Sequence, residues 1–518
     1  MYINCFVDPW LDVAKTINRI HNFAPIYWLG YSEDNSESII NEVFPDIIFH
    51  SDIPDAWRGI FPGLIAKKAT EIELDIDFIK YYASQELQGI KMMDRLDLER
   101  HSFSFMERQQ HWRNLIRNWT ACIDLLEPDL VVTPMIPHRV YDYALYCLCQ
   151  YRDIPFLTFN HTQFNGRFMI LENIFSIGDL YKEDYHHFLK KDSNELYQSL
   201  DIDIKERFDK VKGDYKEAAP YYMATEAKLQ KKSSSTLSLI KTTFCRLWNS
   251  RKNLSHDLTH WIDMYYKYSA DKSLQEKKSA NVIERFHIKR RNNQYLKHLN
   301  TYYHTLTQKP DYDEPYVIYF LHYQPEATTS PTGDIFVDQS LCVDMLLKNT
   351  PKEWKVYVKE HPHQFMYHRE GATSRFKEFY DDLVKNPRVR LISLEESSFD
   401  LIEHCKAIGT VCGTVGWETI VRGKPVILFG ISWYENFTPG VLRITDEASA
   451  SHMTDFINNY HYDEHALLAY LNAVGANSSL AYYYKATHKQ TLGITEDECV
   501  NNIVDAIIKK YEEITKQE

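Results

Sequence analysis

The sequence predicts an α/β protein with two doubly wound, Rossmann-like domains and a helical insertion between them. The chain has 518 residues, and one hydrophobic core stops growing at about 250–300 residues, so at least two domains are expected. Short apolar runs alternate with helical stretches in residues 1–180 and again in 311–518. That alternation is typical of parallel sheets with helices on both faces. Residues 181–310 almost lack Gly and Pro and carry few strand signals, which favours a helical insertion or linker.

The first domain, 1–180, contains five predicted strands. A helix over Leu11–Ile20, a long helical region over 72–126 and a helix over Val140–Gln150 separate them. The strands are Tyr2–Val7, Pro25–Leu29, Asp46–His50, Asp129–Thr133 and Pro155–Phe159.

In the last domain, 311–518, turn residues separate the predicted elements more clearly. This domain also contains five predicted strands. These are Tyr316–Leu321, Lys355–Val358, Val389–Ser393, Ala407–Val411 and Pro425–Phe429. The helices predicted between them are Val337–Leu347, Ser374–Val384, Phe399–His404 and Val415–Val421. Ligands of such sheets bind at the carboxyl ends of the strands, so the loops that follow the strands are the first place to look for function.

Composition excludes several classes of protein. The net charge of −13 argues against a nucleic-acid-binding protein or another general polyanion binder. The nine cysteines form no CxxC pair, so neither a zinc ribbon nor a thioredoxin motif is expected. The N-terminus lacks the pattern of a signal peptide, and no apolar run approaches the ~20 residues of a membrane span. We therefore expect a cytoplasmic protein.

Glycine is scarce, and six of the 17 glycines lie within 32 residues, from Gly409 to Gly440. In this cluster, Gly413-Thr414-Val415-Gly416 follows a predicted strand and opens a helix. Free N–H groups and the helix dipole favour a phosphate at such a turn. Gly416 would allow a close approach of the backbone, and Glu418 suits a ribose hydroxyl pair. The alternative is a tight strand–helix turn with an exposed glutamate.

A second loop with candidate functional residues follows the predicted strand at 355–358. It reads Lys359-Glu360-His361-Pro362-His363. An imidazolium at His361 would stabilise negative charge on a departing phosphate or donate a proton to it. A histidine at a strand end is also common as a purely structural residue.

Three stretches together resemble the capsule polysaccharide biosynthesis protein family. They are YFLHYQPEATTSPTG, VKEHPHQF and GTVCGTVGWETIVRGKPVILFG, in this order within Tyr316–Gly430. This family comprises GT-B-like bacterial glycosyltransferases, which include transferases of Kdo and other nonulosonates. The stretch from Pro137 to Tyr146 is similar to a weaker signature of the same group.

The resemblance implies a GT-B-like frame of two domains that face a cleft. The C-terminal domain would hold a CMP-activated 2-keto sugar acid, and the N-terminal domain an acceptor glycan. By similarity, His361 would contact the CMP phosphate together with Gly413, Thr414 and Gly416, and Glu418 would contact the ribose. Lys359 is a further nucleotide-binding candidate. No cofactor is expected, and no metal either, because the sequence has no Asp-x-Asp motif at a strand end.

The reaction also needs a base or nucleophile near the anomeric carbon. His138 and Asp142 are spaced i, i+4 and would share one helical face if the helix began by His138. The alternative is a helical ion pair without a catalytic role. Glu326, in the donor domain, is the second catalytic candidate, and Asp8, His161 and Glu172 are further carboxylate or imidazole groups at strand ends.

Residues 228–252 contain seven Lys or Arg and no Asp or Glu, with five apolar residues from Leu237 to Trp248 at helical spacing. This pattern suits a helix on an anionic membrane surface. It equally suits a helix that packs on the protein with a solvated basic face.

These observations predict a glycosyltransferase that moves a Kdo-like sugar from its CMP donor to a capsule or other surface-polysaccharide acceptor, which can be a glycolipid. The alternatives are a CDP-glycerol-type glycerophosphotransferase, a UDP-sugar epimerase, and a non-catalytic membrane-associated scaffold.

Overall fold

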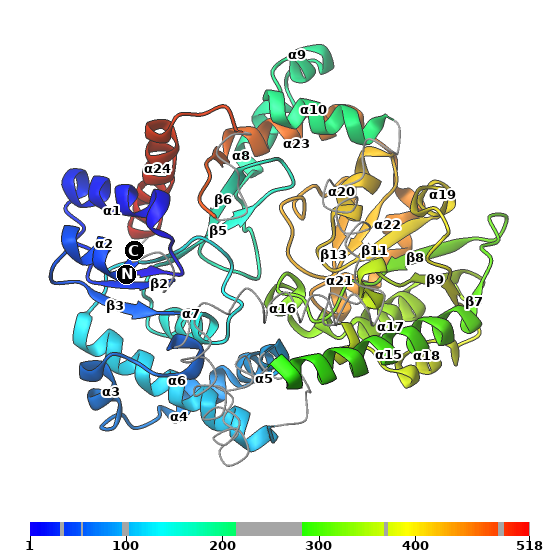
Figure 1. Ribbon diagram of the computed structural model, residues 1–518. Coiled ribbons are helices and arrows are strands. Elements are labelled where there is room, and N and C mark those ends of the chain that lie inside the picture. The colour runs from blue at the N-terminus through cyan, green and yellow to red at the C-terminus, as the bar shows by residue number, and fades with distance from the viewer. Residues whose placement is uncertain are drawn as a thin grey trace. The chain divides into compact units, whose positions relative to one another are not determined.

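The computed structural model describes residues 1–31, 36–52, 55–95, 103–213, 282–366, 371–484 and 492–516. The chain divides into two compact units, each with its own seven-stranded sheet (Figure 1). Unit 1 consists of Met1–Met93, Phe105–Arg207 and Glu464–Glu518, and unit 2 is built mainly from Phe208–Asp463. The predicted α/β class with two Rossmann-like sheets is confirmed. The basic segment 228–252 lies outside the described residues.

The sheet of unit 1 has the strand order β3-β2-β1-β4-β5-β6-β14. Pairing is parallel from β3 to β5, and β6 is antiparallel to both of its neighbours. The direction of the strand order therefore changes between β1 and β4. The strands are β1 (Tyr2–Ile3), β2 (Tyr27–Gly30), β3 (Ile48–Ser51), β4 (Val131–Thr133), β5 (Phe156–His161), β6 (Arg167–Leu171) and β14 (Ser479–Leu480).

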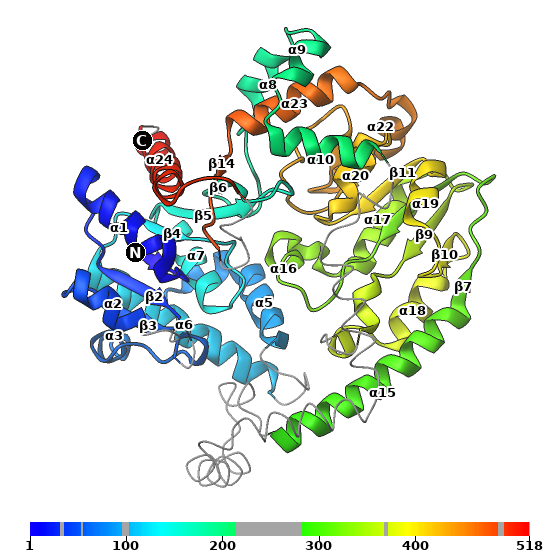
Figure 2. The same cartoon turned by 45° about the horizontal axis from the view of Figure 1, so that its top comes forward.

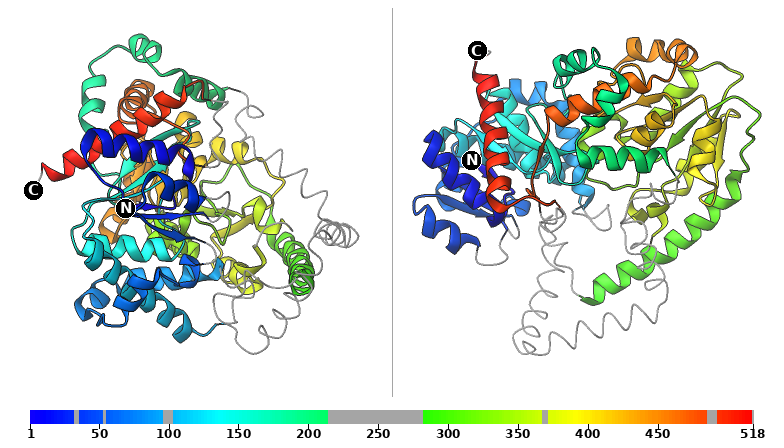
Figure 3. Two further views of the ribbon diagram at one scale, coloured as in Figure 1. Left: turned by 60° about the vertical axis from the view of Figure 1, so that its left-hand side comes forward. Right: turned by 90° about the horizontal axis from the view of Figure 1, so that it is seen from above.

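Helices cover both faces of this sheet (Figure 1). On one face, α1 (Val7–His21) and α24 (Glu496–Thr515) lie side by side and share an apolar core with the strands (Figure 3). On the other face lie α6 (Phe105–Leu126) and α7 (Tyr141–Tyr151). The remaining helices are α2 (Ser36–Val43), α3 (Gly63–Ala69), α4 (Ile76–Tyr81), α5 (Ala83–Met92), α8 (Lys182–Phe188), α9 (Ser193–Gln198), α10 (Ile202–Lys212) and α23 (Glu464–Ala476).

The end of the chain, Glu464–Glu518, belongs to unit 1, so unit 2 ends at Asp463 and not at residue 518, where the predicted domain 311–518 ends. Strand β14 pairs with β6 through Ser479 and Phe168. Helix α24 starts with a capping box, in which Thr495 and Glu498 each bind the backbone N–H of the other. Its apolar stripe, from Cys499 to Ile508, is buried against α1. An amphipathic stripe shows that a helix needs a core but not which sheet supplies that core.

The sheet of unit 2 is entirely parallel and has the order β13-β12-β11-β8-β9-β10-β7 (Figure 2). Its order changes direction between β8 and β11. The strands are β7 (Thr307–Gln308), β8 (Tyr316–Phe320), β9 (Lys355–Lys359), β10 (Val389–Ile392), β11 (Ala407–Thr410), β12 (Val426–Leu428) and β13 (Val441–Arg443). The five predicted strands of this domain are confirmed, and β7 and β13 were not predicted.

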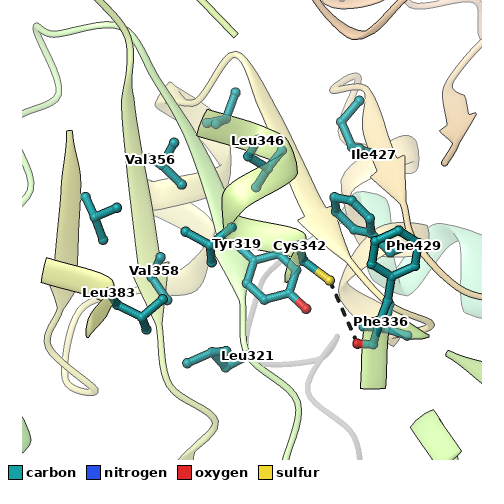
Figure 4. Close-up of a cluster of buried hydrophobic side chains, with 14 of the residues drawn as sticks. Tyr319, Leu321, Phe336, Cys342, Leu346, Val356, Val358, Leu383, Ile427 and Phe429 are labelled. Carbon is teal, nitrogen blue, oxygen red and sulfur yellow. Dashed lines mark hydrogen bonds between the residues drawn. The ribbon is translucent and has the colours of Figure 1, made fainter. Parts of the chain in front are cut away.

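Alternating strand residues form the core on one face of this sheet. Val356, Val358 and Tyr319 pack with Leu346 and Leu383 from two helices (Figure 4). The helices on this face are α15 (Val282–Leu306), α17 (Gln339–Asn349), α18 (Lys377–Val384), α21 (Glu447–Ser451) and α22 (Met453–Asn459). Helices α19 (Ser398–His404) and α20 (Thr414–Val421) lie on the opposite face (Figure 1), and α16 is a single turn at Thr329–Thr332.

The stretch 181–310 is helical where it is described, apart from β7 and the connecting turns. Helices α8 and α9 pack against α23, within unit 1. Helix α15 packs on α18 and contributes Leu299 and Tyr303 to the core of unit 2. The described parts of the stretch 181–310 are therefore divided between the two units and do not form a separate domain.

We predict that Gly89→Ala destabilises unit 1. A Cβ on Gly89, in α5, would lie 2.3 Å from Cζ3 of Trp112, a fully buried side chain of α6. Overpacking of this kind costs about 1–3 kcal/mol, and thermal unfolding followed by circular dichroism would measure it. The matched control is Gly63→Ala in α3, where a Cβ meets nothing within 4 Å. A melting temperature for Gly89→Ala equal to that of the wild type would contradict the packing described here.

Candidate functional site

The loops that follow β8, β9, β11 and β12 meet at the carboxyl edge of the unit 2 sheet. The strand order changes direction between β8 and β11, and in open α/β sheets such a switch point is where ligands bind. Two glycines allow this close packing of loops. A Cβ on Gly333 would lie 2.9 Å from Cγ1 of Val411, and one on Gly430 would lie 2.8 Å from the Thr332 carbonyl oxygen.

His322 connects the two strands at the switch point. Its Nε2 lies 3.0 Å from Thr410 Oγ1 and accepts a hydrogen bond from the Val411 N–H at 3.2 Å. Because Nε2 is an acceptor, the neutral ring carries its proton on Nδ1. Nδ1 lies 3.8 Å from Oε2 of Glu326. Burial, together with the charge of Arg375, lowers the pKa of His322 to about 4.

The backbone of His322 is also fixed. Its N–H donates to Oε1 of Gln339 at 2.7 Å, and its carbonyl accepts from Nε2 of the same side chain at 3.2 Å. The carbonyl accepts a further hydrogen bond from Nη2 of Arg375, also at 3.2 Å. His322, Gln339 and Arg375 thus form a rigid base for the loop that carries Glu326.

The turn at Gly413–Gly416 opens α20, with Gly413 as its N-cap and Thr414 as its first residue. The predicted strand–turn–helix is confirmed, and the space beside Gly416 is filled by a side chain of the protein. A Cβ on Gly416 would lie 2.2 Å from the hydroxyl oxygen of Tyr434, and that hydroxyl donates to the Gly413 carbonyl at 2.6 Å. The close approach that requires glycine is therefore made by Tyr434. Glu418, in the second turn of α20, is 8% exposed rather than a surface residue.

His361 is held with one ring nitrogen pointing inward. Its Nδ1 accepts from the His363 N–H at 3.1 Å and caps the short 3-10 helix Pro362–Phe365. In the neutral ring the proton is therefore on Nε2, which makes Nε2 a hydrogen-bond donor. The His361 N–H donates to Oε1 of Glu360 at 2.7 Å.

Glu360 is the buried anchor of this loop. Its Oε2 accepts from Nε of Arg375 at 2.9 Å and from the Tyr380 hydroxyl at 2.8 Å. Both charged side chains are at least 95% buried. Since Arg375 also binds the His322 carbonyl, one guanidinium joins the loops after β8 and β9. The sequence motif contained Glu360 beside His361, whereas nothing in the sequence pointed to Arg375.

Lys359 ends β9 and reaches toward the loop after β10. Its Nζ donates to the Glu396 carbonyl at 2.6 Å and contacts Ser398 Oγ at 3.0 Å. Burial lowers its pKa to about 8. A contact of Lys359 with a nucleotide stays a prediction, because these two protein partners already fix its ammonium group.

The N-terminal candidates belong to unit 1, and the expectation of a shared helical face is wrong. Helix α7 begins at Tyr141, so His138 lies in the preceding loop. His138 donates from Nδ1 to the Ile136 carbonyl at 2.7 Å, which leaves Nε2 as the basic nitrogen of the neutral ring. Asp142 is fully buried and accepts from Asn4 Nδ2 at 2.9 Å and from the Arg139 N–H at 2.6 Å. This geometry suits Asp142 to positioning the loop rather than to facing a substrate.

The other weighed groups lie elsewhere in unit 1. Asp8 is exposed at the start of α1, His161 is exposed at the end of β5, and Glu172 forms an ion pair with Lys510 at 2.6 Å. Within the described part of the chain, no three His, Cys, Asp or Glu side chains are grouped so as to hold a metal ion. In the same part, no helix is long and apolar enough to cross a membrane.

We predict that His322 contributes to loss of stability in acid. Its pKa falls from 6.5 to about 4 on folding, so the unfolded chain takes up the proton first. The stabilisation is present above about pH 6.5 and is lost toward pH 4, to the extent of roughly 3 kcal/mol. Buried His50 and His111, whose pKa values are also lowered to about 4 by burial, act in the same direction.

Urea titrations at several pH values between 7 and 4.5 would measure this effect. His322→Gln should reduce the decline of the unfolding midpoint over that range, because Gln keeps an acceptor for the Val411 N–H but has no proton to gain. The control is His452→Gln, a change at an exposed histidine. An identical decline in wild type and His322→Gln would show that His322 is not buried as a neutral ring.

Part of the chain resembles a known protein family. Residues 256–475 match the model of the capsule polysaccharide biosynthesis protein family. No curated protein matches the chain at a significant level. Among solved structures, similarity is found to the beta Kdo 2,7 transferase of Thermosulfurimonas dismutans KpsC, at 10% identity and a TM-score of 0.27 over 78% of this chain and 97% of that one.

The beta Kdo 2,4 transferase of the same KpsC has 12% identity and a TM-score of 0.29, over 73% of this chain and 87% of that one. A UDP-GlcNAc 2-epimerase of Methanocaldococcus jannaschii has 9% identity and a TM-score of 0.20, over 78% and 82%. At such TM-scores these structures say nothing about the activity of this chain. The family match includes every site residue of unit 2, and it confirms the resemblance of residues 256–475 to the capsule polysaccharide biosynthesis proteins.

Proposed function

We propose that the protein is a glycosyltransferase that moves a 2-keto sugar acid, such as Kdo, from a CMP-activated donor to a surface-polysaccharide or glycolipid acceptor. The observation that carries the proposal is the meeting of the α20 N-terminus and the His361 loop at the switch point of the unit 2 sheet. These residues lie within the region that matches the family model.

In this proposal the donor phosphate lies at Gly413–Thr414, where the helix dipole and backbone N–H groups favour an anion. Nε2–H of His361 donates a hydrogen bond to the phosphate as it leaves. Glu418 binds the ribose, and Glu326, held near the neutral ring of His322, faces the sugar. Lys359 adds positive charge from behind the loop.

In the transfer step an acceptor hydroxyl oxygen forms a bond to the anomeric carbon of the donor sugar. The bond between that carbon and the phosphate oxygen breaks, and CMP leaves with both electrons of the bond. The hydroxyl proton passes to a base, for which the Nε2 lone pair of His138 is suited by its tautomer. With a nucleoside monophosphate as leaving group, His361 and the helix dipole supply the positive field without a metal ion.

Calorimetric titration of the full chain with CMP, UMP and CDP tests the donor assignment. CMP should bind most tightly. Preference for CDP would favour a glycerophosphotransferase, preference for UMP a UDP-sugar enzyme, and the absence of any nucleotide binding a scaffold. Each of these three outcomes contradicts the proposal.

His361→Ala should lower the rate of CMP release from CMP-Kdo by about 10²–10³-fold, because the leaving phosphate loses a positioned donor. The matched control is His404→Ala, an exposed histidine at the end of α19 in the same unit. Turnover of His361→Ala close to that of the control would remove His361 from the mechanism.

A further inference from the structure

The sheet of unit 1 carries a second group of polar and aromatic residues at the carboxyl ends of consecutive strands. Phe6 follows β1, Tyr31 follows β2 directly, Asp52 follows β3 directly, and Arg139 lies in the loop after β4. The order of this sheet changes direction between β1 and β4. These four residues, called the Arg139 cluster below, therefore lie where an open α/β sheet binds ligands.

The guanidinium of Arg139 is fixed on two sides. Nη1 lies 3.3 Å from Oδ2 of Asp52, and Nη2 donates to the Tyr31 hydroxyl oxygen at 2.7 Å. The side chain of Asp52 is 3% exposed and that of Arg139 is 15% exposed, so the carboxylate is buried and the guanidinium side chain reaches the surface. A guanidinium has five N–H donors. Asp52 and Tyr31 take one each, and the Tyr141 side chain also accepts from this guanidinium, which leaves two for a ligand.

Tyr31 adds a donor and a flat surface. Because its hydroxyl oxygen accepts from Arg139, the hydroxyl proton is directed away from the guanidinium. Its ring stacks on Phe6, with centroids 4.1 Å apart and an angle of 8° between planes. Both rings are partly exposed. A guanidinium and a phenol beside stacked aromatic rings are suited to an oxyanion on a ring-shaped molecule.

The backbone at Arg139 is strained in a way that fixes its position. Val140 has φ 62° and ψ −63°, a conformation that is rare for a β-branched residue. It forms a γ-turn closed by a hydrogen bond from the Tyr141 N–H to the Arg139 carbonyl at 2.6 Å. The turn is held by Asp142, which binds the Arg139 N–H, and by the Tyr141 hydroxyl, which donates to Asn4. Strain of this kind persists where the surroundings impose it and is frequent at ligand sites.

We propose that the Arg139 cluster binds an acidic sugar unit of the acceptor, through its carboxylate or phosphate group. Arg139 and Tyr31 would bind the oxyanion, and the rings of Tyr31 and Phe6 would lie against the sugar. The identification of the ligand as part of the acceptor rests on the proposed function. The residues of the binding site all belong to unit 1. His138, the predicted base, precedes Arg139 directly in the same loop.

Calorimetric titration of the full chain with two matched pairs of probes tests this site. One pair is the methyl glycoside of Kdo and its neutral methyl ester, and the other is N-acetylglucosamine 1-phosphate and N-acetylglucosamine. In at least one pair the wild type should bind the acid about 10-fold or more tightly than its neutral partner. The pair that discriminates identifies the oxyanion as carboxylate or phosphate. Equal or undetectable binding of acid and neutral partner in both pairs would overturn the proposal.

Loss of the guanidinium alone would remove the ion pair of the buried Asp52 carboxylate with Arg139. Arg139→Gln is therefore combined with Asp52→Asn, and Tyr31→Phe serves as a milder variant. We expect the double variant to lose about 10–100-fold in affinity for the acid, and Tyr31→Phe to lose less, with no change for the neutral partner. Arg152→Gln, at the far end of α7, is the matched control. Wild-type affinity in both the double variant and Tyr31→Phe would reject the site.

Titration of the same samples with CMP separates this inference from the proposed function. Normal CMP binding together with failure of the acidic probes rejects the Arg139 cluster and leaves the donor site intact. Absence of CMP binding together with normal binding of the acidic probes rejects the donor site and leaves the Arg139 cluster intact.

Discussion

A single neutral imidazole, that of His322, organises the carboxyl edge of the unit 2 sheet. His322 lies just after β8, and its ring accepts a hydrogen bond from the N–H of Val411, the residue that follows β11. In a protonated ring Nε2 would be a donor and could not accept that bond. Burial lowers the pKa of His322 and so keeps the ring neutral, which is the state that this hydrogen bond requires. The ring lies beside the turn at Gly413 and the loop at Glu326, and the carbonyl of the same residue accepts from the guanidinium of Arg375.

The buried pair Glu360–Arg375 extends the same rigidity to the neighbouring loop. A buried ion pair contributes little net stability, because desolvation offsets most of the attraction. Removal of one partner is nevertheless costly, since it leaves an uncompensated buried charge. Here the pair connects the His361 N–H on one side to the His322 carbonyl on the other. Its main effect is to fix the distance between two loops, which is the property that a site for a charged leaving group needs.

The sequence predicted the α/β class and most central strands, because buried parallel strands form short apolar runs bounded by turn residues. It did not predict β6, β13 or the return of the chain to unit 1 through β14 and α24. Strands of two to five residues have too little pattern, and an amphipathic helix does not specify its partner. The start of α7 was placed too early because Val140 adopts a positive φ, which no β-branched residue signals in a sequence.

The site could be predicted only in part. The glycine turn and His361 stand at strand ends that the pattern located correctly. Gly416 was associated with a ligand, whereas its space is filled by Tyr434, which is 18 positions further along the chain. His322, Arg375 and the Arg139 cluster depend on contacts between loops of different strands, and no local spacing reports such contacts. Asp142 has the residue type of a catalytic group. Its carboxylate is buried and accepts hydrogen bonds from Asn4 and from the Arg139 N–H, which suits it to a positioning role.

In the proposed function the nucleotide binds at the edge of the unit 2 sheet that His322 organises. Hydrogen–deuterium exchange of the full chain with and without CMP tests it most directly, because backbone N–H groups at this edge would bind the phosphate. CMP binding should slow exchange in peptides that cover 360–366 and 410–418. Protection that is absent from both segments, or that is confined to unit 1, would contradict it.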